Sequence, residues 1–256
     1  MAEESVVLTE ARGPVLVMTI NRPEARNSMN KAAAEAMGAA LDRLDAEPDL
    51  SVGVITGTGK GFSAGMDLKG FAAGEFPIAG DRGFAGIAQR SARKPLIAAV
   101  EGFALAGGLE IALACDVIVA SREAKLGIPE VGVGLFAGAG ALLRLPRRVG
   151  QGQAALLALT GKPISGEEGH KIGLVDRVVE PGTALDEALA LAQTIAANAP
   201  LALAASKAVL VGGFTKPDAE FWEWQQQFFS EVFSSKDALE GARAFAEKRP
   251  PNWQGA

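Results

Sequence analysis

The sequence predicts an α/β fold in which parallel strands alternate with helices. Apolar runs at 15–20, 51–56 and 95–100 have the length and composition of strands. Segments with helical periodicity lie between them, which is the pattern that parallel crossover connections require. The 256 residues are 48 % hydrophobic and 21 % charged, so the chain can build one large core.

The elements of the N-terminal half follow one another in close order. A helix is predicted at 31–46, where Met37 and Leu41 share one face. Several glycines and a proline indicate a mobile loop over 71–84. The other predicted elements here are a Gly-rich loop at 57–70, a helix at 107–115 and a strand at 116–120.

Helices dominate after residue 135. A short strand is predicted at 175–180, and a long helix at 184–199 ends at Pro200. The helical segment 221–233 has two apolar stripes, which both core packing and a subunit interface would explain. The stripes are Phe221, Trp224, Phe228 and Val232 on one side and Trp222, Phe229 and Phe233 on the other.

Charge and cysteine content argue against several classes of protein. The chain has 25 Lys and Arg against 30 Asp and Glu, a net charge of −5 that does not favour a nucleic-acid partner. Cys115 is the only cysteine, so no intrachain disulfide can form and a reducing cytoplasm is expected. We expect neither a signal peptide nor a membrane span, because no apolar run is long enough. No cluster of metal ligands is evident, so no metal or redox cofactor is expected.

The Gly-rich loop matches neither of the nucleotide-binding motifs that it superficially resembles. Its glycines lack the spacing of a dinucleotide fingerprint, and Lys60 is followed by Gly61 rather than by the Ser or Thr of a P-loop. Residues 61–65, GFSAG, do match the G-x-S-x-G nucleophile elbow. A serine hydrolase that uses Ser63 and the single histidine, His170, is therefore one alternative. Against it, no clear helix follows residue 65.

Glu110 and Glu130 are acids within apolar sequence. Glu110 lies in the first turn of the predicted helix 107–115, where the helix dipole favours a carboxylate, and capping alone would explain it. Desolvation would raise the pKa of both groups toward the range that suits proton transfer. Gly107 precedes Glu110 and would leave backbone N–H groups approachable at the helix N-terminus, where they could bind a developing oxyanion.

The chain resembles the enoyl-CoA hydratase/isomerase (crotonase) superfamily over essentially its whole length. The resemblance implies a crotonase-like spiral of ββα units over 1–195 and a C-terminal helical region over 196–256 that forms trimers or dimers of trimers. Six segments carry it in the family's order: INRPEARNSMN (20–30), GKGFSAGMDLKG (59–70), KPLIAAVEGFALAGGLEIALACDVIVAS (94–121), AKLGIPEVGVGLFAGAGALLRLPRRVG (124–150), GLVDRVV (173–179) and FAEKRPPNW (245–253).

By this resemblance the protein is an enoyl-CoA hydratase, which adds water reversibly to a trans-2-enoyl-CoA. Glu110 and Glu130 match the two catalytic glutamates of the hydratases, and the backbone N–H groups of Met66 and Gly107 match the oxyanion hole. Ser63 is then no nucleophile. Coenzyme A is part of the substrate, and no other cofactor is implied. The positions implied to contact it are Ala25, Arg26, Ala64, Asp67, Leu68, Lys69, Phe245 and Lys248, the last two often from a neighbouring subunit.

Two further reactions of the superfamily stay open: Δ3-Δ2 enoyl-CoA isomerisation and the dehydration of carnitinyl-CoA. Isomerases commonly use one carboxylate, so the pair favours hydration. Within 134–140, Ala137 stands where hydratases usually have proline, and this segment borders the acyl pocket. Small residues in the 71–84 loop would leave room for a bulky acyl group. The basic residues expected to form a solvated face are Arg144, Arg147 and Arg148.

Overall fold

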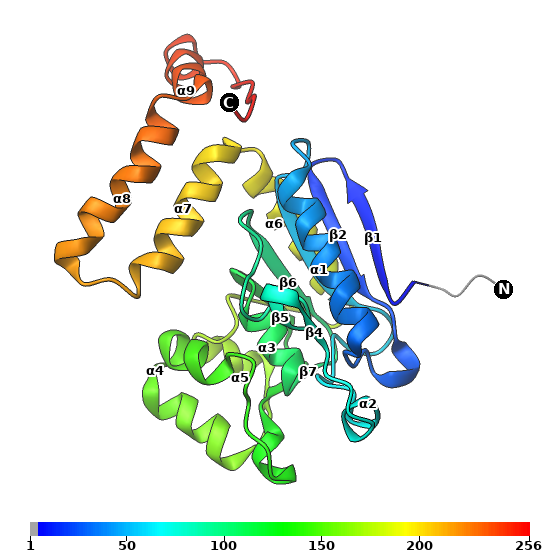
Figure 1. Cartoon of the computed structure of the whole chain (residues 1–256). Helices are drawn as coiled ribbons and strands as arrows, with labels where there is room; N and C mark the ends of the chain where they lie inside the picture. The colour runs from blue at the N-terminus through cyan, green and yellow to red at the C-terminus, as the bar shows by residue number, and fades with distance from the viewer. Residues whose placement is uncertain (1–4) are drawn as a thin grey trace.

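The centre of the molecule is a six-stranded sheet with the strand order β1-β2-β3-β6-β8-β11 (Figure 1). The structure, a computed structural model, describes residues 5–256. β1 and β2 form an antiparallel hairpin, and the other neighbouring strands are parallel. The strands are β1 (Val7–Arg12), β2 (Val15–Ile20), β3 (Val52–Gly57), β6 (Leu96–Val100), β8 (Val117–Ser121) and β11 (Arg177–Val179). The predicted α/β class is confirmed.

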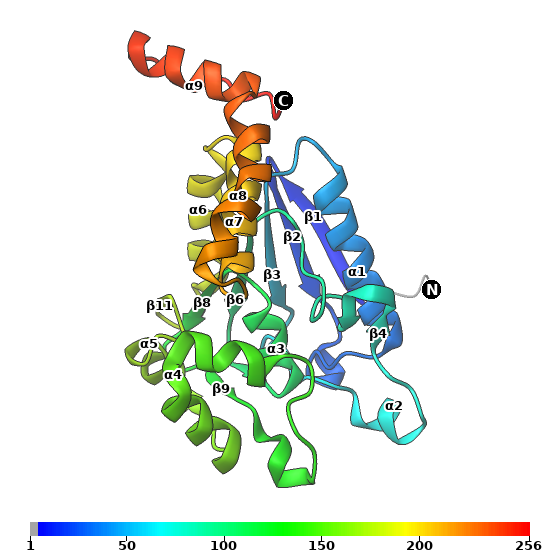
Figure 2. The same ribbon diagram turned by 60° about the vertical axis from the view of Figure 1, so that its left-hand side comes forward.

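Both faces of this sheet are buried, which explains why its strands are apolar runs without polar alternation. Leu16 of β2 faces one core, and its neighbour Val17 faces the other. In Figure 2 the sheet lies between α6 (Ala184–Ala196) on one side and α1 (Lys31–Ala46) on the other. α6 packs on the sheet with alanines four residues apart, which share one helix face. They are Ala184, Ala188 and Ala192.

A second, smaller sheet lies beside the first and gives the fold its spiral form. β6 leads through β7 into α3, and β8 leads through β9 toward α4, so the same ββα unit repeats. Ser63 forms a single parallel bridge with Ala104 of β7, which adds the chain after β3 to this layer. The elements are β7 (Phe103–Leu105), β9 (Lys125–Gly127), β10 (Ile164–Ser165), α3 (Gly107–Leu113) and α4 (Ala141–Thr160).

The segment predicted as a mobile loop contains a short hairpin of β4 (Ile78–Ala79) and β5 (Gly83–Phe84). Between these strands Arg82 is almost completely buried and forms an ion pair of 2.6 Å with Asp42 of α1. Its Nη1 donates to the carbonyl of Arg90 at 2.9 Å. The chain that follows β4 is therefore anchored to α1. The remaining helices of the spiral are α2 (Leu68–Ala72), α5 (Gly166–Lys171) and 3-10 turns at Pro23–Ala25, Gly80–Arg82 and Pro129–Val133.

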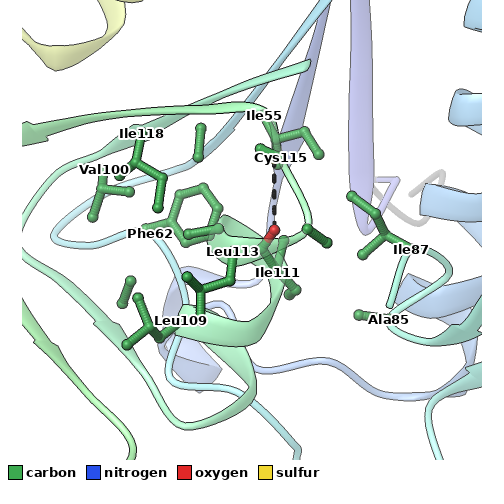
Figure 3. Close-up of a cluster of buried hydrophobic side chains, with 14 of the residues drawn as sticks. Ile55, Phe62, Ala85, Ile87, Val100, Leu109, Ile111, Leu113, Cys115 and Ile118 are labelled. Atoms are coloured by element: carbon green, nitrogen blue, oxygen red, sulfur yellow. Dashed lines mark hydrogen bonds between the residues drawn. The ribbon is translucent and has the colours of Figure 1, made fainter. Parts of the chain in front are cut away.

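An apolar cluster fills the space between the sheets and α3. Figure 3 shows Phe62 at its centre, with Leu109 of α3 and Ile118 of β8 around the ring. Cys115 lies within the same cluster, where its thiol contacts the carbonyl of Ile111 at 3.5 Å. Burial raises the pKa of the Cys115 thiol to about 12, so this cysteine is a packing residue. The cluster fixes α3, and with it Glu110, against the sheet.

The C-terminal helices α7 (Pro200–Gly213), α8 (Asp218–Phe233) and α9 (Lys236–Glu247) extend away from the sheets (Figure 1). Phe221 and Trp224 of α8 lie against the two glycines that end α7. Trp222 and Phe233, on the other stripe, are each 66 % exposed. The explanation by core packing is therefore wrong for the second stripe, and a subunit interface at this stripe stays a prediction. So does the division of the chain after residue 195.

Within the described residues, no single helix is both long and apolar enough to cross a membrane. α6 and α7 meet that test only as a pair, and the pair is bent by 110°. The expected lack of a signal peptide rests in part on residues 1–4, which lie outside the described residues.

Gly102, in the turn from β6 to β7, connects the two sheets and offers a test of the fold. Its φ is +59°, and an added Cβ would overlap the carbonyl oxygen of Lys60. We expect Gly102→Ala to lower the free energy of unfolding by about 2–4 kcal/mol, from backbone strain plus overpacking. Gly13→Ala is the matched control, because Gly13 has the same φ and nothing within 4 Å. Urea denaturation that gives both variants equal losses would contradict this explanation.

Candidate active site

A pocket of about 910 Å³ opens between α2, the β4–β5 hairpin, α3 and the start of α4. Ligand sites commonly have volumes of about 300–1,000 Å³, so this one suits a sizeable organic group. Its lining is mostly apolar, with Phe84 and Phe136 among the larger side chains. Among the residues that the structure describes, three charged side chains line it: Glu110, Glu130 and Arg144.

Glu110 lies in the first turn of α3 and is only 3 % exposed. Its Oε1 accepts hydrogen bonds from the backbone N–H groups of Ala139, at 2.7 Å, and Ala141, at 3.1 Å. Burial raises the pKa of this carboxyl group, while the two N–H donors and the charge of Arg144 oppose the rise. Both donors converge on Oε1, which leaves Oε2 available to a small molecule in the pocket.

Glu130 lies in the 3-10 turn that follows β9, on another wall of the same pocket. Its Oε2 is buried and has no hydrogen-bond partner among residues 5–256. Burial raises the pKa of Glu130, and the negative charge of Glu110 raises it further. A carboxyl group in these surroundings favours its protonated form. The predicted pair of semi-buried acids does therefore line one cavity.

The loop around Gly65 touches the start of α3, a proximity that the sequence alone did not establish. Gly65 has a φ of +91°, and an added Cβ would lie 2.6 Å from the backbone nitrogen of Gly107. Met66 forms a parallel bridge with Met29 in which its own N–H takes no part. The N–H of Met29 donates to the carbonyl of Gly65, and the N–H of Asp67 donates to the carbonyl of Met29. Among the described residues, no acceptor bonds the N–H of Met66 or of Gly107. Both residues line the pocket, so two unbonded N–H groups lie at its wall.

Close backbone packing explains why this region needs glycine. An added Cβ at Gly108 would overlap the carbonyl of Ser63, and one at Gly107 would overlap the ring of Phe84. Ala106, just before α3, has a φ of +51° and a ψ of −128°, an unfavourable conformation for a residue with a Cβ. Such strain is often found at functional sites, where it holds backbone groups in a required orientation.

The structure rules out the Ser63–His170 hydrolase. Ser63 is completely buried, and its hydroxyl donates to the carbonyl of Asn27 at 2.8 Å while accepting from the N–H of Gly65 at 3.1 Å. His170 is exposed on α5, where its Nδ1 lies 2.9 Å from the carbonyl of Val175. Neither residue lines the pocket. Ser63 instead shapes the loop that presents Met66.

Most of the residues implied to contact coenzyme A lie at one edge of the pocket. The N–H of Ala64 donates to the carbonyl of Arg26 at 3.1 Å, so the segments 25–26 and 64–69 adjoin. The side chain of Asp67 is already engaged, because it caps α2 and pairs with Arg22 at 3.0 Å. Leu68 lines the pocket, and Lys69 follows it on the exposed helix α2.

Phe245 and Lys248 are not brought to this edge. Both views show α9 at the opposite end of the molecule from α2 (Figures 1 and 2). Phe245 is 88 % exposed, and Lys248 ends α9 with a φ of +55°. These residues therefore lie too far from the pocket of their own chain to contribute to it.

The prediction that three arginines of α4 form a solvated basic face is wrong for two of them. Arg144 turns into the pocket and donates from Nη2 to the carbonyl of Ala88 at 2.6 Å. Arg148 donates to the carbonyl of Leu174 and pairs with Asp176, both at 3.0 Å. No local pattern distinguishes either residue from Arg147, which is exposed as expected. Residues 5–256 hold no group of three His, Cys, Asp or Glu side chains placed to bind a metal ion.

Comparison with known proteins identifies the family of this chain. The family model described as enoyl-CoA hydratase/isomerase matches residues 10–256. The chain belongs to this family, and with it to the crotonase fold that the sequence resembles.

Individual relatives share both the sequence and the fold over nearly the full length. The crystal structure of the enoyl-CoA hydratase EchA1 from Mycobacterium marinum is 52 % identical with a TM-score of 0.97, over 99 % of this chain and 100 % of that one. A carnitinyl-CoA hydratase structure from Mycobacterium avium is 42 % identical with a TM-score of 0.80, over 99 % and 100 %. A carnitinyl-CoA dehydratase from Salmonella paratyphi A is 41 % identical over 98 % of this chain and 99 % of its own.

Because Glu130 is half-buried and has a raised pKa, its ionisation destabilises the folded protein. At a pH above the raised pKa the fold holds an unfavourable charge, and this cost disappears as the pH falls toward the usual value of 4.5. We expect Glu130→Gln to raise the Tm at pH 8 by a few degrees, since a protein of this size gains about 2–4 °C per kcal/mol.

The difference in Tm should shrink as the pH is lowered toward 4.5, and calorimetry at several pH values measures it. Glu123→Gln, at an exposed position, is the control and should leave the Tm unchanged at each pH. A Glu130→Gln protein with a lower Tm than the parent at pH 8 would contradict this account of the site.

Proposed function

We propose that this protein is an enoyl-CoA hydratase, which adds water to a trans-2-enoyl-CoA and gives a 3-hydroxyacyl-CoA. The observation that carries the proposal is the placement of the buried Glu110, the half-buried Glu130 and two unbonded backbone N–H groups around one apolar pocket. The names of the relatives support the same class of reaction, because both hydration and dehydration interconvert these two kinds of thioester.

The free N–H groups of Met66 and Gly107 would hold the thioester carbonyl oxygen. When water adds at C3, negative charge moves onto this oxygen as an enolate. Fixed donors bind that charge more tightly than the neutral carbonyl, and one such donor typically contributes about 3–4 kcal/mol to the transition state. The strained backbone at Ala106 supports this role, because it orients the donors before substrate arrives.

The surroundings of the two glutamates support a division of roles between them. Burial raises the pKa of Glu110, but its two N–H bonds and the charge of Arg144 oppose the rise and stabilise the carboxylate, which suits a general base. Glu130 has an unpartnered buried oxygen and the charge of Glu110 nearby, which favours the protonated acid. Glu110 takes a proton from water as the oxygen bonds to C3, and Glu130 delivers its proton to C2. Dehydration reverses both transfers.

The apolar lining supports a hydrophobic acyl group. Val133, Leu135 and Phe136 are exposed where the segment after Glu130 borders the pocket, and Phe76 and Ile78 are exposed across from them. Together with Ala137 in the position where hydratases usually have proline, this favours a bulky acyl chain over crotonyl. Dehydration of carnitinyl-CoA, which the names of several relatives suggest, would use the same residues. An isomerase would need only one of the two acids.

We expect Glu110→Gln and Glu130→Gln each to lower kcat about 10²- to 10⁴-fold, the usual contribution of a positioned acid or base. The assay follows the loss of the conjugated enoyl-thioester absorbance with crotonyl-CoA, a medium-chain enoyl-CoA and a bulky enoyl-CoA. Glu123→Gln should retain full activity. Isomerisation that survives one of the two substitutions, without any hydration by the parent protein, would replace this proposal with the isomerase.

We further propose that the protein forms homo-oligomers through its C-terminal helices. The second stripe of α8 leaves the large apolar side chains of Trp222, Phe229 and Phe233 exposed, and such patches mark interaction surfaces. A neighbouring copy would also supply Phe245 and Lys248 to the CoA end of the pocket, which the same chain does not do.

The combined change Trp222→Glu and Phe233→Glu should dissociate the oligomer, because it places two charges at the proposed contact. Light scattering after size-exclusion chromatography measures the mass of both proteins. Leu8→Glu on β1 introduces one such charge away from the helices and should leave the mass unchanged. A parent protein that elutes as a monomer of 26.3 kDa at assay concentration would contradict the proposal.

A further inference from the structure

Arg144 lines the catalytic pocket without taking part in the proton transfers of hydration. It lies in the first turn of α4, and its Nη2 donates to the carbonyl of Ala88 at 2.6 Å. Its Nη1 is buried and has no acceptor among residues 5–256. An added Cβ at Gly140, where φ is +109°, would overlap this Nη1, so glycine makes room for the guanidinium. A buried cation with an unpaired donor is unfavourable for folding.

Residues 139–144, at the start of α4, provide both hydrogen bonds to the Glu110 carboxylate as well as a nearby positive charge. The N–H groups of Ala139 and Ala141 bond its Oε1, and the charge of Arg144 follows three residues after Ala141. Among the ion pairs of the described residues, none joins Glu110 to Arg144 within 4.0 Å. The interaction therefore acts through space, across an interior of low polarity where charges are weakly screened.

Arg144 distinguishes between the two glutamates. Burial raises the pKa of Glu110, and the positive charge of Arg144 opposes that rise, whereas the groups that act on Glu130 are its burial, its own N–H and the charge of Glu110. Without this cation, two carboxyl groups that line one pocket would compete for a single proton, as closely placed acids do. Two more titratable groups face Arg144: Cys115, beyond the end of α3, and Arg147 on α4.

We propose that Arg144 is a positioning residue that keeps Glu110 ionised as the base and leaves the shared proton on Glu130. Through the carbonyl of Ala88 it also fixes the pocket wall of residues 82–89 against α4. Arg82 anchors the other end of this wall to α1, and Phe84 within the wall packs against Gly107. The proposal rests on the hydratase function, because it assigns unequal roles to the two acids.

The test is the pH profile of kcat/KM for Arg144→Met, Arg144→Gln and Arg144→Lys. The acid limb reports the ionisation of the base in the free enzyme. Loss of the cation should move this limb upward by about one pH unit, with most activity recovered at alkaline pH. Arg144→Lys keeps the charge and should restore the limb. A role in folding alone would lower activity equally at every pH and leave the limb where it is.

Arg148→Met is the matched control, because Arg148 is the next arginine along this face of α4, also binds backbone carbonyls and does not line the pocket. It should lower stability without moving the limb. An unmoved limb in Arg144→Met and Arg144→Gln, with an active parent enzyme, would overturn the proposal while leaving the hydratase intact.

A second measurement does not depend on turnover. The infrared spectrum of the parent and of each Arg144 variant is compared with that of the same protein carrying Glu110→Gln. The difference follows the titration of the Glu110 carboxyl group directly. Its midpoint should rise in Arg144→Met and return in Arg144→Lys. If the parent protein hydrates no enoyl-CoA, the hydratase proposal fails, and an unchanged midpoint in this titration would then also reject the role of Arg144.

Discussion

The direct backbone contact between the loop at 63–66 and the start of α3 is the constraint on which the rest of the site depends. Only glycines at 65, 107 and 108 permit it, because a side chain at any of them would meet backbone or the ring of Phe84. The contact places two N–H groups from distant parts of the sequence on one wall. The two sheets and the cluster around Phe62 serve to hold this approach in place (Figure 3).

Several groups around this contact oppose folding. Glu110 and Glu130 are desolvated acids, Arg144 has an unpaired buried donor, and Ala106 has a strained backbone. The large apolar core, which covers both faces of the main sheet, offsets these costs. A site that binds developing charge must be organised before the charge appears, so its polar groups cannot relax into their most stable arrangement.

The sequence predicted what depends on regular patterns. The helix at 31–46 and the strand at 15–20 have their predicted bounds, because periodicity over 6 to 16 residues is a strong signal. β7 and β9 have only three residues each, too few for a pattern, so the second sheet was implied by family resemblance alone. The two acids stood out against apolar neighbours. Arg144 did not stand out, because its sequence surroundings resemble those of Arg147. Only the orientation of α4 in the fold turns Arg144 into the pocket and leaves Arg147 exposed.

The donors that would polarise the thioester belong to the main chain, and this has a consequence for how such a protein can change over time. A substitution can alter or remove a side chain, but every residue except proline keeps its N–H. Activation of the substrate therefore tolerates a change of side chain at position 66, provided that the glycines at 65, 107 and 108 are kept. The acids at 110 and 130 and the apolar wall are side chains, and each can be replaced separately. New reactions on acyl thioesters can thus arise in such a lineage by small steps, each starting from a catalyst that already works.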